Sequence, residues 1–395
     1  MKELSYLAQA VVASSTIAVD TLAKQLKAQG KDVISFGPGE PDFDTPDNIK
    51  EAGIKAIQMG ETKYTPASGL LSLKQAIANR LKEDCGLDYA PEQIVAASGA
   101  KHSVYLVLQA LINPGDEVII PAPFWVTYAE AVKMAGGVPV IIEAGEDQQF
   151  KIKPEQVEAA VTSKSKLFLL NNPSNPTGML YSKEELLALC DVCVRHDLYI
   201  MADEIYYHLV YDGEFVSVAS LGDEIKERTI IVNGVSKSYS MTGWRIGYTA
   251  SNSQIAKVIG NYVSHSTGNP STMAQIAAIE ALTGDQSSIA EMHKAFHARR
   301  DYICKRVAEI EGLRCIVPNG AFYVFVNMES FLGKTLGGVE INNGDDFAMA
   351  LLNEVQVAVV PGAGFGAPNF IRLSYATSME NITEGLNRIA QFVKA

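Results

Sequence analysis

The sequence predicts an α/β fold whose large domain is built on a mostly parallel sheet covered by helices. Two observations lead to this prediction. Short apolar segments with the length of strands alternate with helical stretches through the middle of the chain. Polar or glycine-rich segments directly follow these strands, and ligands of open α/β sheets bind beyond the carboxyl ends of the strands. The predicted strands cover residues 93–97, 117–120, 167–170, 198–201 and 229–232.

The C-terminal quarter has a different pattern and predicts a smaller α+β domain. A long helical region and several short strands come first, and a final helix, 379–394, places Ile382, Leu386 and Ile389 on one face. We also predict a helix at 17–29 and a strand at 33–36. The long helical region covers 288–311, and the strands that follow it lie near 315–327, 357–360 and 370–375.

Length and composition exclude several classes of protein. A chain of 395 residues with 47% hydrophobic and 20% charged residues is typical of a globular protein with two domains. The net charge of −12 argues against a nucleic-acid partner, because binding to phosphates requires clustered cations. No apolar run approaches the length of a membrane span, and residues 1–10 lack the apolar core of a signal peptide. We therefore expect neither membrane insertion nor secretion.

The cysteine pattern predicts reduced thiols and a cytoplasmic location. The five cysteines are an odd number scattered over a long chain, which does not indicate a disulfide framework. Cys190 and Cys193 have the spacing of a metal-binding or redox pair, yet they fall in a helical pattern, and no second pair completes a zinc site. Buried helix positions are the preferred interpretation, and no metal site is predicted.

Four polar segments stand out by their position and order. Lys237 follows the predicted strand 229–232 in the run Val-Asn-Gly-Val-Ser-Lys-Ser, and Arg245 lies eight residues later. A lysine after a strand is more often a surface cation, so Lys237 alone carries little weight. The other segments are Asn-Asn-Pro-Ser-Asn-Pro-Thr-Gly (171–178), Ala-Asp-Glu-Ile-Tyr (202–206) and Phe-Ile-Arg-Leu-Ser-Tyr-Ala (370–376).

Together these segments resemble the class I and II aminotransferases, pyridoxal-phosphate enzymes of fold type I, and most closely the bacterial aspartate aminotransferases of subgroup Ib. The resemblance extends from about residue 14 to the C-terminus. It implies pyridoxal 5′-phosphate as the cofactor and a homodimer with shared active sites. It also implies a large cofactor-binding domain at 46–287 and a discontinuous small domain formed by 1–45 and 288–395.

The resemblance implies a role for each polar group near the cofactor ring. Lys237 is the amine that binds the cofactor covalently and then transfers the proton at the substrate Cα. Asp203 is the anion beside the ring nitrogen, although an aspartate after a strand is also a common helix N-cap. Tyr206 and Asn175 donate to the ring oxygen, although an asparagine in such a turn often serves the turn alone. Trp125 stacks on the ring face, unless it is an ordinary interior tryptophan.

A phosphate-binding cup is expected where the strand 93–97 meets the helical run 102–111. Small residues there allow backbone N–H groups to approach a phosphate, and the helix terminus adds its positive end. Many relatives have a serine at the position of Gly234, so the cup is expected to have one hydroxyl fewer. The residues that the resemblance assigns to the phosphate are Gly99, Ala100, Lys101, Ser236, Arg245 and, from the neighbouring subunit, Tyr64.

Arg372 is the expected partner of the substrate α-carboxylate. Its strand is apolar, and a buried guanidinium requires an anionic partner, which a structural salt bridge would supply equally well. The resemblance favours a bidentate contact with the substrate. It also places Asn175 and Trp125 beside the substrate and brings the backbone of Gly39 close to the same carboxylate.

Lys101 is the residue expected to set substrate specificity. Subgroup Ib enzymes bind a second, side-chain carboxylate with a lysine at this position, and Ser15 or Thr16 could donate to the same group. The alternative is an exposed lysine in the first turn of a helix, where the helix dipole does not favour a cation.

The predicted activity is transfer of the amino group from L-aspartate to 2-oxoglutarate, giving oxaloacetate and L-glutamate, in two half-reactions that share one site. Aromatic amino acids, prephenate or other substrates are alternatives, as is a carbon–sulfur β-lyase with the same cofactor. A cofactor-sensing transcription regulator is disfavoured, because only about a dozen residues precede the resemblance and a DNA-binding domain needs more.

Overall fold

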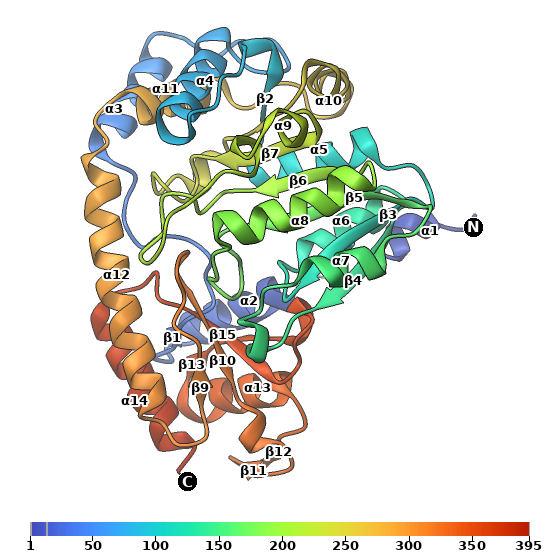
Figure 1. The fold of residues 1–395 in the computed structure, drawn as a ribbon. Helices are drawn as coiled ribbons and strands as arrows, with labels where there is room; N and C mark the ends of the chain where they lie inside the picture. Colours follow the sequence, from blue (N-terminus) through green and yellow to red (C-terminus); the bar gives the residue numbers. More distant parts are fainter. Residues whose placement is uncertain (1, 13–14, 395) are drawn as a thin grey trace.

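A seven-stranded sheet forms the centre of the larger part of the molecule (Figure 1). The computed structural model describes residues 2–12 and 15–394, with no description of the side chains of 15–18 and 20. All strands of this sheet run parallel except β8, which is antiparallel to both neighbours. In spatial order the strands are β2 (Ile94–Ala97), β8 (Gly247–Ala250), β7 (Thr229–Gly234), β6 (Tyr199–Asp203), β5 (Ser165–Asn171), β3 (Glu117–Ala122) and β4 (Val138–Glu143).

Helices cover both faces of this sheet, which confirms the predicted fold class. Alternate residues of one strand enter opposite cores: Leu167 and Leu169 of β5 pack on one side, and Phe168 and Leu170 on the other. The first side is covered by α5 (Ala100–Leu111), α6 (Thr127–Met134) and α10 (Ser253–Ser266). The second is covered by α7 (Pro154–Ala160), α8 (Lys183–Arg195) and α9 (Asp223–Arg228).

Local sequence explains where α8 begins. The Ser182 hydroxyl accepts a hydrogen bond from the backbone N–H of Glu185 at 3.2 Å, and the Glu185 carboxylate accepts one from the N–H of Ser182 at 2.7 Å. This reciprocal cap satisfies two amides that have no partner within the helix. Cys190 and Cys193 lie buried on this helix, in the core beneath the sheet, where the helical pattern predicted them.

A third group of helices packs at the β2 end of the sheet (Figure 1). Their apolar faces meet Ile94 and Ala96 of β2 and Tyr248 of β8. These helices are α3 (Asp47–Gln58), α4 (Leu71–Cys85) and α11 (Thr272–Thr283).

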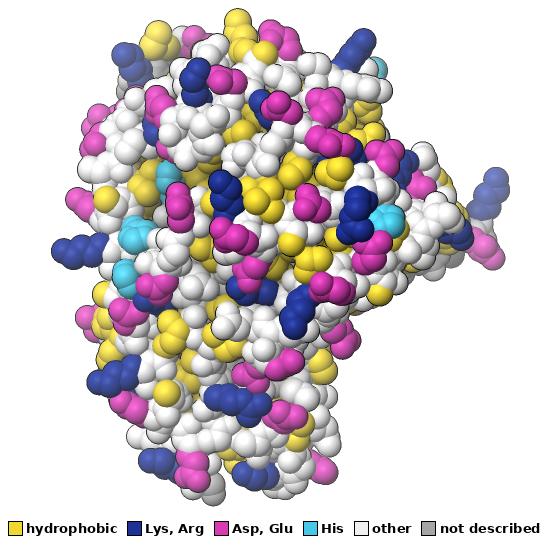
Figure 2. All heavy atoms as spheres, in the orientation of Figure 1, with side chains coloured by type: hydrophobic (Ala, Val, Ile, Leu, Met, Phe, Trp, Pro, Cys, Tyr) yellow, Lys and Arg dark blue, Asp and Glu magenta, His cyan; other side chains and the backbone are white. Residues whose placement is uncertain are grey.

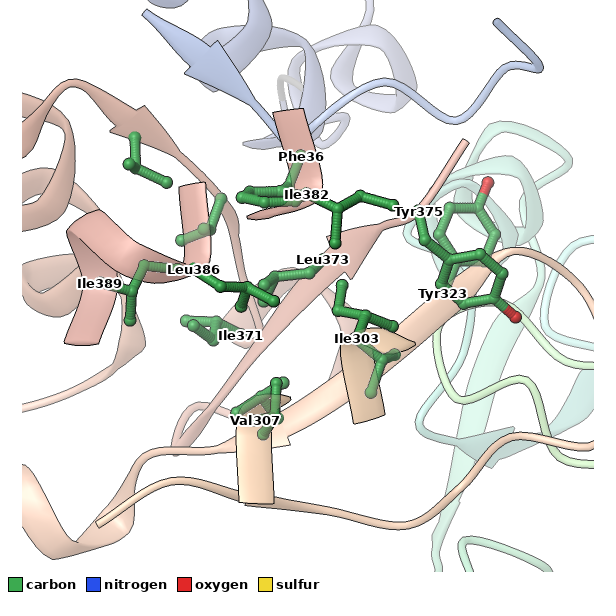
Figure 3. Packing of buried hydrophobic residues seen from close by; sticks show 14 of the residues in the cluster. Phe36, Ile303, Val307, Tyr323, Ile371, Leu373, Tyr375, Ile382, Leu386 and Ile389 are labelled. Carbon is green, nitrogen blue, oxygen red and sulfur yellow. The ribbon is translucent and has the colours of Figure 1, made fainter. Parts of the chain in front are cut away.

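The C-terminal part contains an antiparallel sheet packed against long helices. Figure 3 shows the aliphatic side chains of its core, where Ile303, Leu373 and Leu386 meet from α12, β15 and α14. The sheet order is β14 (Val360–Pro361), β15 (Phe370–Ser374), β10 (Tyr323–Asn327) and β9 (Arg314–Cys315). The helices are α12 (Ser287–Ala308), α13 (Gly344–Val355) and α14 (Met379–Phe392), and a small hairpin joins β11 (Thr335–Leu336) to β12 (Val339–Glu340).

The N-terminal segment packs against this C-terminal part. Strand β1 (Ile34–Ser35) pairs in parallel with β13 (Val357–Ala358), and Phe36 is fully buried among the C-terminal residues. Before β1 come α1 (Tyr6–Gln9) and α2 (Ser15–Ala28). Segments more than 300 residues apart in the sequence therefore share one core.

Charged side chains of both signs are interspersed over the face shown in Figure 2, with hydrophobic groups in small areas between them. A chain with net charge −12 and this mixture offers no extended basic surface on that face. Among the described residues, no helix has the length and apolar character that crossing a membrane requires.

Candidate active site

A cavity of about 340 Å³ lies beyond the carboxyl ends of the parallel strands and reaches the C-terminal part of the chain. Both sheets contribute to its walls, because Asp203 ends β6 and Arg372 lies on β15. The sequence-predicted residues that line it are Gly39, Ala100, Lys101, Trp125, Asn175, Asp203, Tyr206, Ser236, Lys237, Arg245 and Arg372.

Lys237 emerges three residues after the end of β7 and is half-buried. Its ammonium group donates a hydrogen bond to the carbonyl oxygen of Gly39, which lies in the N-terminal segment shortly after β1. Burial lowers the pKa of Lys237 to about 8, because desolvation disfavours the charged form. A larger fraction of this amine is therefore neutral near pH 7 than for an exposed lysine.

Asp203 is the last residue of β6 and is buried. One carboxylate oxygen accepts a hydrogen bond from the Tyr128 hydroxyl at 2.6 Å, and the other accepts one from the backbone N–H of Ile205 at 3.2 Å. Burial raises the pKa of Asp203 to about 6, although the Tyr128 hydrogen bond acts in the opposite direction. No helix begins at this residue, so the N-cap alternative is excluded.

The N-terminus of α5 and the Arg245 guanidinium meet at another wall of the cavity. Arg245 donates hydrogen bonds to the carbonyl oxygens of Thr242 at 2.9 Å and Ser98 at 3.2 Å. Gly99 has φ +88°, and a Cβ there would collide with the same guanidinium. Only glycine allows Arg245 to lie this close to the first turn of α5.

Gly234 does not line the cavity. A Cβ at this position would lie 2.8 Å from the carbonyl oxygen of Ile246 and 2.9 Å from the Cα of Gly247 on β8. The glycine is therefore required by the close approach of β7 and β8. A serine hydroxyl at this position would meet the neighbouring strand.

Arg372 is buried, and its partners among the described residues are neutral. Its guanidinium donates to the side-chain oxygen of Asn175 at 3.0 Å and to the carbonyl oxygen of Gly37 at 2.8 Å. Its Nε is buried without a hydrogen-bond partner, and no described carboxylate forms an ion pair with it. The structural salt bridge that the strand pattern left open is thus not found among the described residues.

Two tyrosines that the sequence analysis did not assign belong to the site. Tyr128, on α6, supports Asp203 through its hydroxyl. Tyr323, on β10, joins its hydroxyl to that of Tyr206 at 2.9 Å. Strand alternation could have indicated Tyr323, because it places this residue on the same face of the sheet as Phe325. Phe325 is the residue that pairs with Arg372 across the two strands.

Of the predicted residues whose side chains are described, Tyr64 and Gly99 do not line the cavity of the single chain. Tyr64 is 98% exposed and lies outside the cavity. The side chains of Ser15 and Thr16 lie outside the described part of the structure. Gly99 contributes through its contact with Arg245 rather than as a lining residue.

Comparisons with known proteins agree with this geometry. The profile of the family "Aminotransferase class I and II" matches residues 31–389. The chain is 50% identical to an aspartate aminotransferase of Bacillus sp. strain YM-2, over the full length of both. It is 49% identical to an aspartate/prephenate aminotransferase of Cereibacter sphaeroides, covering 96% of each chain.

A solved structure of an aspartate aminotransferase has the same fold as this chain. The aspartate aminotransferase of Thermus thermophilus with maleate superposes with a TM-score of 0.94 at 39% identity, covering 99% of this chain and 100% of that one. The architecture, the cavity at the strand ends and the family profile all indicate the same family. The chain therefore belongs to the class I and II aminotransferases, pyridoxal-phosphate-dependent transaminases of fold type I.

Proposed function

We propose that this protein transfers the amino group of L-aspartate to 2-oxoglutarate. One observation carries this proposal: a single cavity contains Lys237 and Asp203 together with two cations, Arg372 and Lys101. Neither cation has a carboxylate partner among the described side chains. A substrate with two carboxylates would supply the buried Arg372 with an anion and bring its second carboxylate to Lys101, which is exposed in the first turn of α5.

The residues present fit pyridoxal phosphate. An amine of lowered pKa and a buried carboxylate face one cavity, and a helix N-terminus with Arg245 lies at its wall. Bound there, the cofactor would supply an electron sink for the substrate Cα and a carrier for the amino group. Asp203 would stand beside the ring nitrogen, and Trp125 beside a ring face.

Lys237 would perform two tasks. Its neutral amine would bind the cofactor covalently, which the lowered pKa favours. The same nitrogen would also move the proton between the substrate Cα and the cofactor carbon C4′.

The polar groups around the ring would fix its orientation. Tyr206 and Asn175 would donate to the ring oxygen. Arg372 donates to Oδ1 of Asn175, so this oxygen is occupied and the amide NH₂ is the group left to donate. Tyr128 would hold the Asp203 carboxylate in place.

The phosphate would lie against the start of α5. Backbone N–H groups of the first turn have no partner within the helix, and the helix dipole favours an anion there. Arg245 would add a fixed charge and Ser236 a hydroxyl, while Gly99 and Ala100 keep the approach open.

Arg372 would clamp the substrate α-carboxylate, with the backbone of Gly39 close by. Lys101 would bind the side-chain carboxylate, with Ser15 or Thr16 as a second donor. The Lys101 ammonium lies 5.1 Å from the centroid of the Trp125 ring, at the rim of the same cavity. Prephenate is a second candidate substrate, since it carries two carboxylates and the Cereibacter relative is named for it.

The proposal includes a cytoplasmic homodimer with shared sites. Tyr64 is 98% exposed, and Ile54, Ile57 and Leu71 are also more than half exposed; exposed apolar side chains of this size are common at interfaces. Sedimentation analysis should give twice the chain mass. Mixing the Tyr64→Ala and Lys237→Ala proteins after mild dissociation should restore part of the activity, because mixed dimers would contain one intact site.

We also propose that the division at residues 45 and 287 separates two domains. The separate cores support this, since Phe36 packs with the C-terminal residues and α4 with the seven-stranded sheet.

The five cysteines are free thiols, which supports the proposed cytoplasmic location, a reducing compartment.

The function is tested first by absorbance. The protein supplied with pyridoxal phosphate should show a visible band, and L-aspartate should bleach it at lower concentration than L-phenylalanine or L-alanine. Replacing Lys101 by methionine should lower kcat/KM for aspartate by about 10- to 100-fold, the value of one charge-assisted hydrogen bond. The value for phenylalanine should change less than about twofold. Preference for phenylalanine in the native protein would overturn the aspartate assignment.

A further inference from the structure

Tyr323 contacts two groups of the site at once. Its hydroxyl lies 2.9 Å from the hydroxyl of Tyr206, and its ring centroid lies 4.3 Å from the guanidinium carbon of Arg372. All three side chains are buried. In Figure 3 the ring of Tyr323 lies at one end of the aliphatic core, with its oxygen turned away from the aliphatic side chains.

The strand register produces this arrangement. Tyr323 pairs with Ser374 and Phe325 pairs with Arg372 across β10 and β15. Tyr323 and Arg372 are therefore diagonal neighbours on one face of the sheet, within reach of an aromatic ring. Because Nε of Arg372 has no hydrogen-bond partner, two neutral oxygens and two rings hold the guanidinium in position, and the Tyr323 ring at 4.3 Å is nearer than the Phe365 ring at 5.2 Å.

The loop that contacts Lys237 also rests on Tyr323. A Cβ at Gly39 would lie 2.7 Å from the Tyr323 hydroxyl, so the backbone of Gly39 passes directly over this oxygen. The carbonyl of the same residue accepts the hydrogen bond of Lys237. Tyr323 therefore contacts Tyr206, Arg372 and the loop that contains Gly39.

We propose that Tyr323 is a positioning residue that couples Tyr206, the donor to the cofactor ring oxygen, to Arg372, the clamp for the substrate α-carboxylate. The inference rests on the proposed function. The hydroxyl orients the Tyr206 hydroxyl toward the ring oxygen, and the ring fixes the plane of the guanidinium. The two halves of the side chain therefore affect two different measurements.

Two substitutions separate these halves. Tyr323→Phe removes the hydroxyl and keeps the ring; the affinity for pyridoxal phosphate, measured by titration of cofactor-free protein, should weaken about fivefold. The pH at which the visible band changes should shift in the same direction as in Tyr206→Phe, while KM for aspartate stays within about twofold. Tyr323→Leu also removes the ring, and KM should rise about tenfold above the Phe variant, because the cation–π contact is lost.

Matched controls identify the cause. Tyr89→Phe removes a different buried hydroxyl, one without a hydrogen-bond partner and outside the cavity, and should leave the spectrum unchanged. Adding Tyr323→Phe to Tyr206→Phe should shift the spectrum no further, since the coupled hydroxyl is already gone. Thermal unfolding of each cofactor-free variant separates these effects from a loss of folding.

The outcomes distinguish this inference from the function itself. A native spectrum and native cofactor affinity in Tyr323→Phe, with both altered in Tyr206→Phe, would overturn the coupling. An equal rise of KM in the Phe and Leu variants would overturn the role of the ring, and with it the proposal. Absence of cofactor binding by the native protein would instead overturn the proposed function, and the coupling with it.

Discussion

The two walls of the cavity balance their charges differently. The wall formed by the seven-stranded sheet carries both signs, with Asp203 at the end of β6 and Lys237 after β7. The wall formed by the antiparallel sheet carries the cation Arg372, which in the described part of the chain donates hydrogen bonds only to neutral oxygens. The first wall therefore combines the anion Asp203 with several cations, because Arg245 and Lys101 also line the cavity on this side, whereas the second wall has one buried cation without a carboxylate partner among the described residues.

This difference assigns the two walls to different ligands. A buried charge is costly unless a counter-ion accompanies it, so the wall with Arg372 is most stable when an external carboxylate is bound. The wall with both signs suits a permanently bound group that carries charges of both signs. Substitutions in the cofactor wall and in the substrate wall should therefore change different measured quantities.

Replacing Lys237 by alanine should lower kcat by at least about 1,000-fold, because both the covalent attachment and the proton transfer at Cα are lost. Steady-state assays measure this, and circular dichroism should show an unchanged fold. Replacing the exposed Lys257 by alanine is the control and should leave kcat unchanged. Transamination that persisted in the Lys237 variant would remove this residue from the cofactor wall.

Replacing Arg372 by leucine should lower kcat/KM for aspartate by about 100- to 1,000-fold, since a bidentate charge-assisted contact is lost. Cofactor affinity should change only a few-fold, because the cofactor wall is intact. Kinetic assays and cofactor titration test the two parts separately. An unchanged KM together with a large loss of cofactor affinity would contradict the separation of the walls.

Replacing Asp203 by asparagine should stabilise the cofactor-free protein at neutral pH. Burial raises the folded-state pKa of Asp203 to about 6 from 3.8, so the folded state is penalised progressively as the pH rises through this interval. The gain in unfolding free energy of the variant should therefore grow by about 2 kcal/mol between pH 4 and pH 7. Denaturant titrations at the two pH values measure it; a gain that shrinks as the pH rises would refute the assignment.

Replacing Gly234 by serine should lower the unfolding free energy by about 1–2 kcal/mol, because its Cβ would lie 2.8 Å from the Ile246 carbonyl. Cofactor affinity should not improve, since the position faces β8 rather than the cavity. Gly260 on α10 is the control, because a Cβ there meets nothing within 4 Å. Tighter cofactor binding in the Gly234 variant would restore this position to the phosphate cup.

The sequence alone predicted the cofactor wall better than the substrate wall. Parallel strands buried on both faces are continuous apolar runs, and the polar residues that follow them, such as Asp203 and Lys237, are adjacent in sequence to the strands that position them. Among the strands that were not predicted, two belong to the seven-stranded sheet, β4 and β8. β4 is an apolar edge strand that contains Pro139 and is largely exposed. β8 is a short stretch that follows directly after the segment containing Arg245.

The sequence by itself determined the fold class, the family and most of the residues that line the cavity, because these depend on local hydrophobic patterns and on motifs of fixed spacing. Only the tertiary structure decided that Arg372 has no carboxylate partner among the described residues and that Gly234 is required by β8. It also decided that Tyr128 and Tyr323 support the site. These facts depend on which distant segments meet, and the partner of a buried group across a strand pair leaves no mark in the sequence around that group.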